Sequence, residues 1–315
     1  MTTKADITMN PKTELLINNI EKSIIGKRTV IMKLTAALLS GGHVLIEDVP
    51  GVGKTRLVTA LAKSVSGSCS RIQFTPDLMP SDITGFTMIN PKTGESEFRP
   101  GAAMCNFLLA DEINRASPKA QSALLEIMEE LQISADGATY KLPVPFMALA
   151  TQNPVETYGT YHLPEAQMDR FMMKISIGYP EKSEEMQLLG GGFGRTVETE
   201  PVMTLDDVME LRRQAENVRV NDSVKRYIVD IVTATRESDL TILGASPRGS
   251  IALYSAAKSY ALINGRDFAV PEDVRDMACE VLAHRLMLSP KGKSAFGVPI
   301  AAMRYILENT PVPTE

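Results

Sequence analysis

Apolar residues recur along this chain at spacings that separate helices from strands. Between residues 11 and 40 they recur every three to four positions, which predicts two helices separated at Gly26. Helical spacing returns after Thr55 and after Ser117, whereas short continuous apolar runs are typical of buried strands. The strand candidates lie at 43–46, 71–74, 106–110, 146–150 and 172–177. Strands that alternate with helices predict an α/β fold with a mostly parallel sheet.

Two segments inside this pattern predict β-hairpins. Residues 86–98 are strand-like on both sides of a turn at 90–94, and residues 133–142 surround an Asp136-Gly137 turn. The first hairpin would interrupt a helix that starts near Pro80. We therefore expect two hairpins inserted into the α/β core.

The alternation stops near Tyr179-Pro180. The sequence GGGFG at 190–194 is typical of a flexible joint, and the rest of the chain is expected to be all helical. Its helices are predicted from Thr204, where Asp207 completes a capping box, and at about 222–238, 247–264 and 271–287. These observations predict N-terminal helices with an α/β core over 1–180, a linker over 181–200 and a helical domain over 201–315.

Residues 42–55, GHVLIEDVPGVGKT, have the order of a phosphate-binding loop: a strand, a glycine turn, Lys-Thr and then a helix. Such a loop closes backbone N–H groups around phosphate oxygens at a helix N-terminus. Lys54 would reach the outer phosphates, and the Thr55 hydroxyl could bind Mg²⁺. Asp48 stands where this loop usually begins with glycine, and its effect on nucleotide affinity stays open. A chance Gly-Lys-Thr turn is the alternative interpretation.

A second strand end supplies acidic groups. Asp111 and Glu112 follow the run at 106–110, where Asp111 could hold Mg²⁺ and Glu112 could polarise an attacking water. Asn153 follows the run at 146–150, so its amide could orient the water or the γ-phosphate at the same sheet edge. A solvated acidic pair and an Asn-Pro turn are the alternatives. Together with the loop, the pair predicts nucleotide hydrolysis.

Composition narrows the function classes. The net charge of −5, the absence of tryptophan and an aromatic content of 5% are not typical of a nucleic-acid-binding protein. Three cysteines and three histidines are dispersed without the spacing of metal ligands, which indicates reduced thiols. No apolar run is long enough to cross a bilayer, and the first ten residues lack a signal-peptide core. We therefore expect a cytoplasmic protein without a membrane span.

Four longer motifs resemble the MoxR family of AAA+ ATPases, in the helix-2-insert branch. They are LLADEINRA at 108–116, AQSALLE at 120–126, ATQNP at 150–154 and LPEAQMDRF at 163–171. The resemblance extends from Ile25-Gly26 to the C-terminal helices. It implies a P-loop NTPase core with two inserted hairpins, followed by a helical lid.

The resemblance also implies roles for single residues. Arg170 matches the arginine finger presented to a neighbouring subunit, and Arg248 matches sensor 2, in cis or in trans. From the residues alone Arg170 could equally be a surface charge, although a guanidinium fork suits a transferring phosphoryl group better than lysine does. The resemblance further implies that Ile25 and Gly26 lie over adenine and that Asn153 is sensor 1. The Walker B pair would be Asp111 and Glu112. The Walker A loop would comprise Pro50, Gly51, Val52, Gly53, Lys54, Thr55 and Arg56.

The family further implies ATP and Mg²⁺ as ligands, a hexameric ring with active sites between subunits, and hairpins that face a pore or a client. The clients would be proteins matured in a chaperone-like way, often with a von Willebrand factor A-domain partner. Two alternatives remain open. One is a nucleic-acid motor, since related helix-2-insert proteins include helicases, and the other is a nucleotide-gated switch that hydrolyses little ATP.

Overall fold

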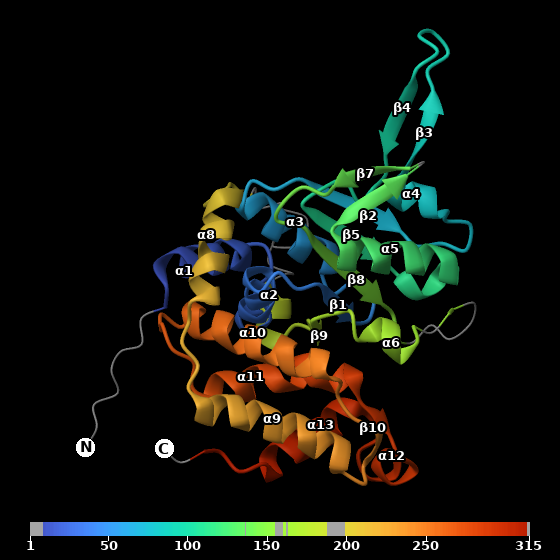
Figure 1. Cartoon of the computed structure of the whole chain (residues 1–315). Helices are drawn as coiled ribbons and strands as arrows, with labels where there is room; N and C mark the ends of the chain where they lie inside the picture. Colours follow the sequence, from blue (N-terminus) through green and yellow to red (C-terminus); the bar gives the residue numbers. More distant parts are fainter. Residues whose placement is uncertain (1–8, 136, 155–159, 162, 188–198, 314–315) are drawn as a thin grey trace.

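A five-stranded sheet organises the N-terminal part of the molecule (Figure 1). The computed structural model describes residues 9–313 apart from 136, 155–159, 162 and 188–198. Every neighbouring pair of strands in this sheet is parallel, which confirms the α/β prediction. The strand order is β2 (Cys69–Gln73), β5 (Phe107–Asp111), β8 (Met147–Gln152), β1 (Val44–Glu47) and β9 (Met173–Ile175).

The central strands are apolar because both faces of the sheet are covered. Alternate side chains of a strand point to opposite faces, so Val44 and Ile46 join one hydrophobic cluster and Leu45 joins the other. The cluster of Val44 is covered by α1 (Pro11–Glu21), α2 (Arg28–Leu39), α3 (Lys54–Ser64) and several C-terminal helices. The cluster of Leu45 is covered by α4 (Pro80–Thr84) and α5 (Pro118–Glu130).

Both predicted hairpins are present. β3 (Gly85–Ile89) pairs with β4 (Ser96–Pro100), and β6 (Gln132–Ala135) pairs with β7 (Ala138–Lys141), each pair antiparallel. The first hairpin projects far from the sheet, at the top of Figure 1. Phe98 stacks on Tyr140 with ring centroids 3.8 Å apart, so an aromatic contact joins the two hairpins at their bases. Asp136, in the second turn, lies outside the described residues.

The C-terminal part is mainly helical and also contains two short strands. The expectation of an all-helical segment is wrong, because β10 (Thr241–Leu243) pairs with β11 (Met287–Leu288) in a small antiparallel sheet. The helices are α7 (Lys182–Gln187), α8 (Leu205–Glu216), α9 (Asp222–Glu237), α10 (Pro247–Ile263), α11 (Pro271–Leu282), α12 (Pro290–Phe296) and α13 (Pro299–Asn309), and the short α6 (Glu165–Met168) precedes them in the core.

The helix predicted at 271–287 is also shorter than expected. α11 ends at Leu282 and a 3₁₀ turn follows at Ala283–Arg285. The Arg285 guanidinium is buried against Asp169, with 2.7 Å between Nε and Oδ1. This tertiary contact, which helical spacing cannot reveal, coincides with the end of the helix. The capping box of Thr204 and Asp207 is confirmed at the start of α8.

The predicted glycine joint at 190–194 lies outside the described residues. The predicted boundaries at 180 and 200 therefore stay predictions. Buried residues of α1 and α2 share one hydrophobic cluster with those of α8, α10 and α11, so the cluster spans both predicted domains. In the described part of the chain, helices that combine the length and the apolarity needed to cross a bilayer are absent.

Candidate active site

The carboxyl ends of three adjacent strands place the predicted groups at one edge of the sheet. The phosphate loop follows β1, Asp111 ends β5, and Asn153 follows β8, which lies between them. Parallel strands end at the same edge, and ligands of such sheets bind there. Gly51 and Gly53 have φ values of +89° and +95°, a backbone region that favours glycine. The loop therefore turns tightly into α3, whose first residue is Lys54.

Lys54 lies across the ends of two strands. Its Nζ donates to the carbonyl oxygens of Asp48, at 2.6 Å, and Gln152, at 3.3 Å. Partial burial lowers the pKa of Lys54, while the nearby carboxylates of Asp48, Asp111 and others act to raise it. An ammonium group held by neutral carbonyls beside a helix N-terminus is well placed to exchange them for phosphate oxygens.

The position of Asp48 in the loop suggests a carboxylate that faces the phosphate site, but its hydrogen-bond partners lie elsewhere. Its side chain is buried, and Oδ2 accepts hydrogen bonds from the backbone N–H groups of Ile177, at 2.5 Å, and Gly178, at 2.9 Å, and from Ser176 Oγ, at 3.1 Å. The carboxylate is therefore engaged by the segment that follows β9.

Thr151 of β8 holds the acidic pair in place. Its hydroxyl donates to Asp111 Oδ1 at 2.6 Å and accepts the backbone N–H of Glu112 at 2.9 Å. Glu112 has a φ of +55°, which is uncommon for a residue with a side chain and is supported here by that hydrogen bond. Thr151 was not predicted from the sequence, although its place near the end of a buried strand, two residues before Asn153, was a usable signal.

Polar side chains also contact the two carboxylates directly. Asp111 Oδ2 accepts from Arg71 Nη2 at 2.6 Å, and Glu112 Oε2 accepts from Gln73 Nε2 at 2.6 Å and Arg115 Nη1 at 2.9 Å. Arg71 and Gln73 belong to β2, the strand beside β5, and Gln73 is in register with Asp111. Neither residue was predicted from the sequence.

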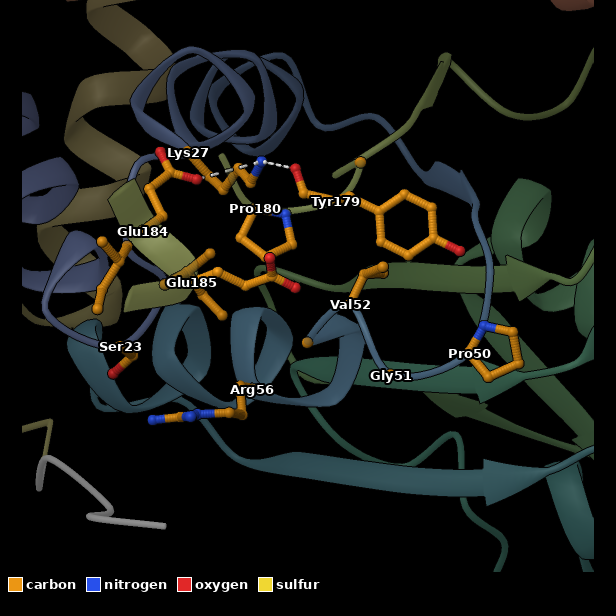
Figure 2. Close-up of a pocket in the computed structure, with 14 residues that line it drawn as sticks. Ser23, Lys27, Pro50, Gly51, Val52, Arg56, Tyr179, Pro180, Glu184 and Glu185 are labelled. Atoms are coloured by element: carbon orange, nitrogen blue, oxygen red, sulfur yellow. Dashed lines mark hydrogen bonds and ion pairs between the residues drawn. The ribbon is translucent and has the colours of Figure 1, made fainter. Parts of the chain in front are cut away.

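A cavity of about 420 Å³ lies beside the phosphate loop (Figure 2). Six of the residues predicted to bind nucleotide line this cavity, namely Ile25, Pro50, Gly51, Val52, Gly53 and Arg56. Gly26 packs against Glu184 so closely that an added Cβ would lie 1.5 Å from Glu184 Oε1. Thr55 is exposed and lines an adjoining cavity together with Ser23 and Arg56.

The opposite wall of this cavity was not foreseen. Lys27 Nζ donates to the carbonyl oxygen of Tyr179 at 2.8 Å and pairs with Glu184 at 3.8 Å, as Figure 2 shows. From the sequence, Tyr179-Pro180 was predicted only as the end of the α/β pattern. Its position immediately after the last strand, at the same sheet edge, was the signal. The lining residues outside the prediction are Ser23, Ile24, Lys27, Gly178, Tyr179, Pro180, Glu184 and Glu185.

Arg170 and Arg248 lie together at a second cavity of about 240 Å³. Both pair with Glu129 of α5, at 2.9 Å for Arg170 Nη1 and 2.6 Å for Arg248 Nη2. Arg170 Nη1 also donates to the carbonyl oxygen of Leu125 at 3.0 Å. Among the described residues that line the cavity of the phosphate loop, neither arginine is present. Within one chain the two arginines therefore share Glu129 as a partner and do not line the cavity beside the phosphate loop.

The donor set suits a magnesium ion held partly by a nucleotide. The described residues contain no group of three or more His, Cys, Asp or Glu side chains arranged for a metal. Mg²⁺ is commonly bound by one or two carboxylates together with substrate phosphates and water. Asp111 at the strand end and Thr55 at the start of α3 fit this mode.

Comparisons with known proteins agree with this geometry. Residues 43–173 match the ATPase family associated with various cellular activities (AAA), and residues 233–299 match the AAA lid domain. A crystal structure of a candidate ATPase from Cytophaga hutchinsonii superposes with a TM-score of 0.89 at 38% identity, covering 97% of this chain and 96% of that one. The fold and site thus define an AAA+ ATPase with a lid, an enzyme that hydrolyses ATP.

Two relatives refine this assignment. The uncharacterized protein YeaC of Bacillus subtilis (strain 168) is 50% identical over 98% of this chain and 97% of its own length. Chaperone MoxR1 of Mycobacterium tuberculosis is 40% identical over 95% of this chain and 82% of its own length. The chain belongs to the MoxR family of AAA+ ATPases.

Proposed function

We propose that this ATPase works as a Mg²⁺-dependent ring, with each site completed by a neighbouring subunit, and that hydrolysis remodels protein clients. The observation that carries the proposal is the separation of Arg170 and Arg248 from the phosphate loop, together with their shared contact to Glu129. A transferring phosphoryl group needs cationic stabilisation, which an arginine supplied in trans can provide. A second subunit would bring these guanidinium groups to the nucleotide.

Within one subunit, the proposed roles follow the contacts at the sheet edge. Lys54 would exchange its carbonyl partners for phosphate oxygens, and Glu112 would orient and polarise the attacking water. Asn153, buried beyond the end of β8, would position that water or the γ-phosphate. Bound Mg²⁺ neutralises phosphate charge, and Thr55 and Asp111 are the residues that would hold it.

The client-facing surface is proposed from the projecting hairpin. Phe86, Met88 and Ile89 of β3 expose 51%, 38% and 69% of their surfaces, which is unusual for apolar side chains placed so close together. The relative named Chaperone MoxR1 supports a protein client. By resemblance to the family we propose a hexamer, a von Willebrand factor A-domain partner and a cytoplasmic location. The core, linker and lid boundaries near 180 and 200 belong to the same proposal.

The decisive experiment compares wild type with Glu112→Gln in ATP binding, phosphate release and assembly state. We expect the variant to bind ATP, to lose turnover by at least about 100-fold, and to form an ATP-dependent ring visible by mass photometry. Lys54→Ala should lose ATP binding. Turnover per subunit that does not change over a dilution range in which the ring dissociates would contradict the intersubunit site.

The same variant separates the two alternatives. A wild type that binds ATP but turns over no faster than Glu112→Gln would support the nucleotide-gated switch. Stimulation of ATP hydrolysis by DNA, without stimulation by protein, would support a nucleic-acid motor. A pull-down with the ATP-locked Glu112→Gln ring should instead enrich proteins, with Lys54→Ala as the nucleotide-free control.

A further inference from the structure

Asp48 connects three parts of the site that are distant in sequence. Its backbone N–H donates to the carbonyl oxygen of Gln152 at 3.2 Å, which joins the loop to β8. Its own carbonyl oxygen accepts from Lys54 Nζ at 2.6 Å. Its carboxylate accepts from Ser176, Ile177 and Gly178, the segment that follows β9. The sheet, the phosphate-binding lysine and this segment therefore meet at one residue.

The segment held by Asp48 leads directly into the wall of the cavity. Gly178, Tyr179 and Pro180 line the cavity together with Val52 and Pro50, and Figure 2 shows Tyr179 and Pro180 on the side away from Gly51. Gly178 has a φ of +70°, so the chain turns sharply between its hydrogen bond to Asp48 and the start of the wall. Asp48 is only 8% exposed, so the loss of its carboxylate would leave two adjacent N–H groups without their acceptor.

The cavity has two chemically different ends. The phosphate loop offers backbone N–H groups and Lys54 to anionic oxygens. The other end presents Ile25, Tyr179 and Pro180, which suit a flat apolar group such as a purine base. Lys27 holds Tyr179 by donating to the Tyr179 carbonyl oxygen, while the Asp48 carboxylate accepts the N–H groups of Ile177 and Gly178, the two residues before Tyr179. The wall is thus fixed on both sides, and only the Asp48 anchor is built into the loop itself.

We propose that Asp48 is a positioning residue for the base and ribose of the nucleotide. It acts through Ile177 and Gly178, which set the place of Tyr179 and Pro180, and not through contact with the phosphates. This inference rests on the proposed function, because it takes the cavity as the nucleotide site. It predicts that Asp48 contributes to the affinity for ATP and little to the affinity for a ligand made of phosphates alone.

The test measures binding of ATP and of inorganic tripolyphosphate, both with Mg²⁺, by isothermal titration calorimetry. Asp48→Asn should raise the Kd for ATP roughly tenfold, because a charged acceptor of two N–H groups becomes a neutral one. Ser176→Ala removes one donor and should raise it about two- to threefold. Neither variant should change the Kd for tripolyphosphate by more than about twofold.

Glu47→Gln is the matched control. Glu47 is the neighbouring carboxylate on β1, and it pairs with Lys174 at 2.7 Å instead of the segment after β9. This variant removes the same charge one residue away and should leave both Kd values within about twofold of wild type. A loss of ATP affinity equal to that of Asp48→Asn would show a general charge effect and overturn the inference.

The outcomes separate the inference from the function on which it rests. A wild type that binds no ATP would refute both. A wild type that binds ATP, with an unchanged Kd in Asp48→Asn, refutes the inference alone, and so does an equal loss of affinity for ATP and tripolyphosphate. If thermal unfolding shows that Asp48→Asn is misfolded, Ser176→Ala decides: a wild-type Kd for ATP in that variant overturns the inference.

Discussion

Replacing Thr151 by valine would test how the acidic pair is held. Valine has nearly the same shape, so the change removes the hydroxyl without opening a cavity. That hydroxyl donates to Asp111 Oδ1 at 2.6 Å and accepts the N–H of Glu112 at 2.9 Å, and Thr151 is fully buried. Both acidic residues would lose a partner in one substitution.

The size of the effect follows from these two hydrogen bonds. Losing a hydrogen bond to an ionised acceptor costs about 1.5–3 kcal/mol, and leaving a buried N–H without an acceptor costs about 1–3 kcal/mol. The two losses share one hydroxyl, so we expect the free energy of unfolding to fall by about 2–4 kcal/mol. Glu112, with a φ of +55°, would also lose the contact that supports its backbone. Its carboxylate would shift, and kcat should fall roughly 10- to 100-fold.

Urea unfolding and phosphate release measure these two effects separately. The ATP Kd should stay within about threefold of wild type, because the loop and the cavity lining are unchanged. Thr35→Val is the matched control: Thr35 is also fully buried, and its hydroxyl donates to the carbonyl oxygen of Ile31, one helical turn earlier in α2. A Thr151→Val enzyme with the wild-type kcat, whatever its stability, would refute this account of the acidic pair.

Three further predictions address other parts of the molecule. Gly26→Ala should raise the ATP Kd at least about tenfold, since its Cβ would collide with Glu184, whereas Gly297→Ala has a similar φ of +71° with open space around it and should not. Arg170→Ala should bind ATP normally but hydrolyse it about 100-fold more slowly, measured by phosphate release from the assembled ring. His43 has a pKa lowered by burial from 6.5 to about 4, so it takes up a proton on unfolding below pH 6.5. This proton uptake by His43 should lower the free energy of unfolding by about 1.5 kcal/mol from pH 6.5 to 5. Urea titrations of His43→Gln at these pH values should lack that decrease.

Each of these predictions has an opposing result. Equal ATP affinities of the two alanine variants would show that Glu184 yields to a methyl group. Normal turnover of Arg170→Ala would exclude Arg170 as the trans-acting group. If the pH dependence of unfolding were identical in His43→Gln and wild type, the His43 ring would not need to be neutral in the folded protein, although its Nδ1 accepts the N–H of Ala148.

Much of the core could be predicted because local patterns there agree with the tertiary structure. The strands at the sheet centre are buried on both faces, so their apolar runs are unambiguous, as for 106–110 and β5. The glycines at 51 and 53 mark a turn that only residues without a side chain adopt easily. Local reasoning failed at β10 and β11, where two short strands far apart in sequence pair with each other.

The sequence by itself determined the chemistry at the sheet edge: the strand, the glycine turn with Lys54, and the acidic pair at 111 and 112. Each of these two groups is made of consecutive residues, so the order of residues along the chain dictates the local arrangement within each group. Tertiary structure alone decided the partners across the sheet and the cavity. Thr151, Gln73 and Tyr179 reach the site from other strands and connections, and the Asp48 carboxylate is taken up by the segment after β9. Such contacts depend on strand order and register, which residue spacing along one chain does not encode.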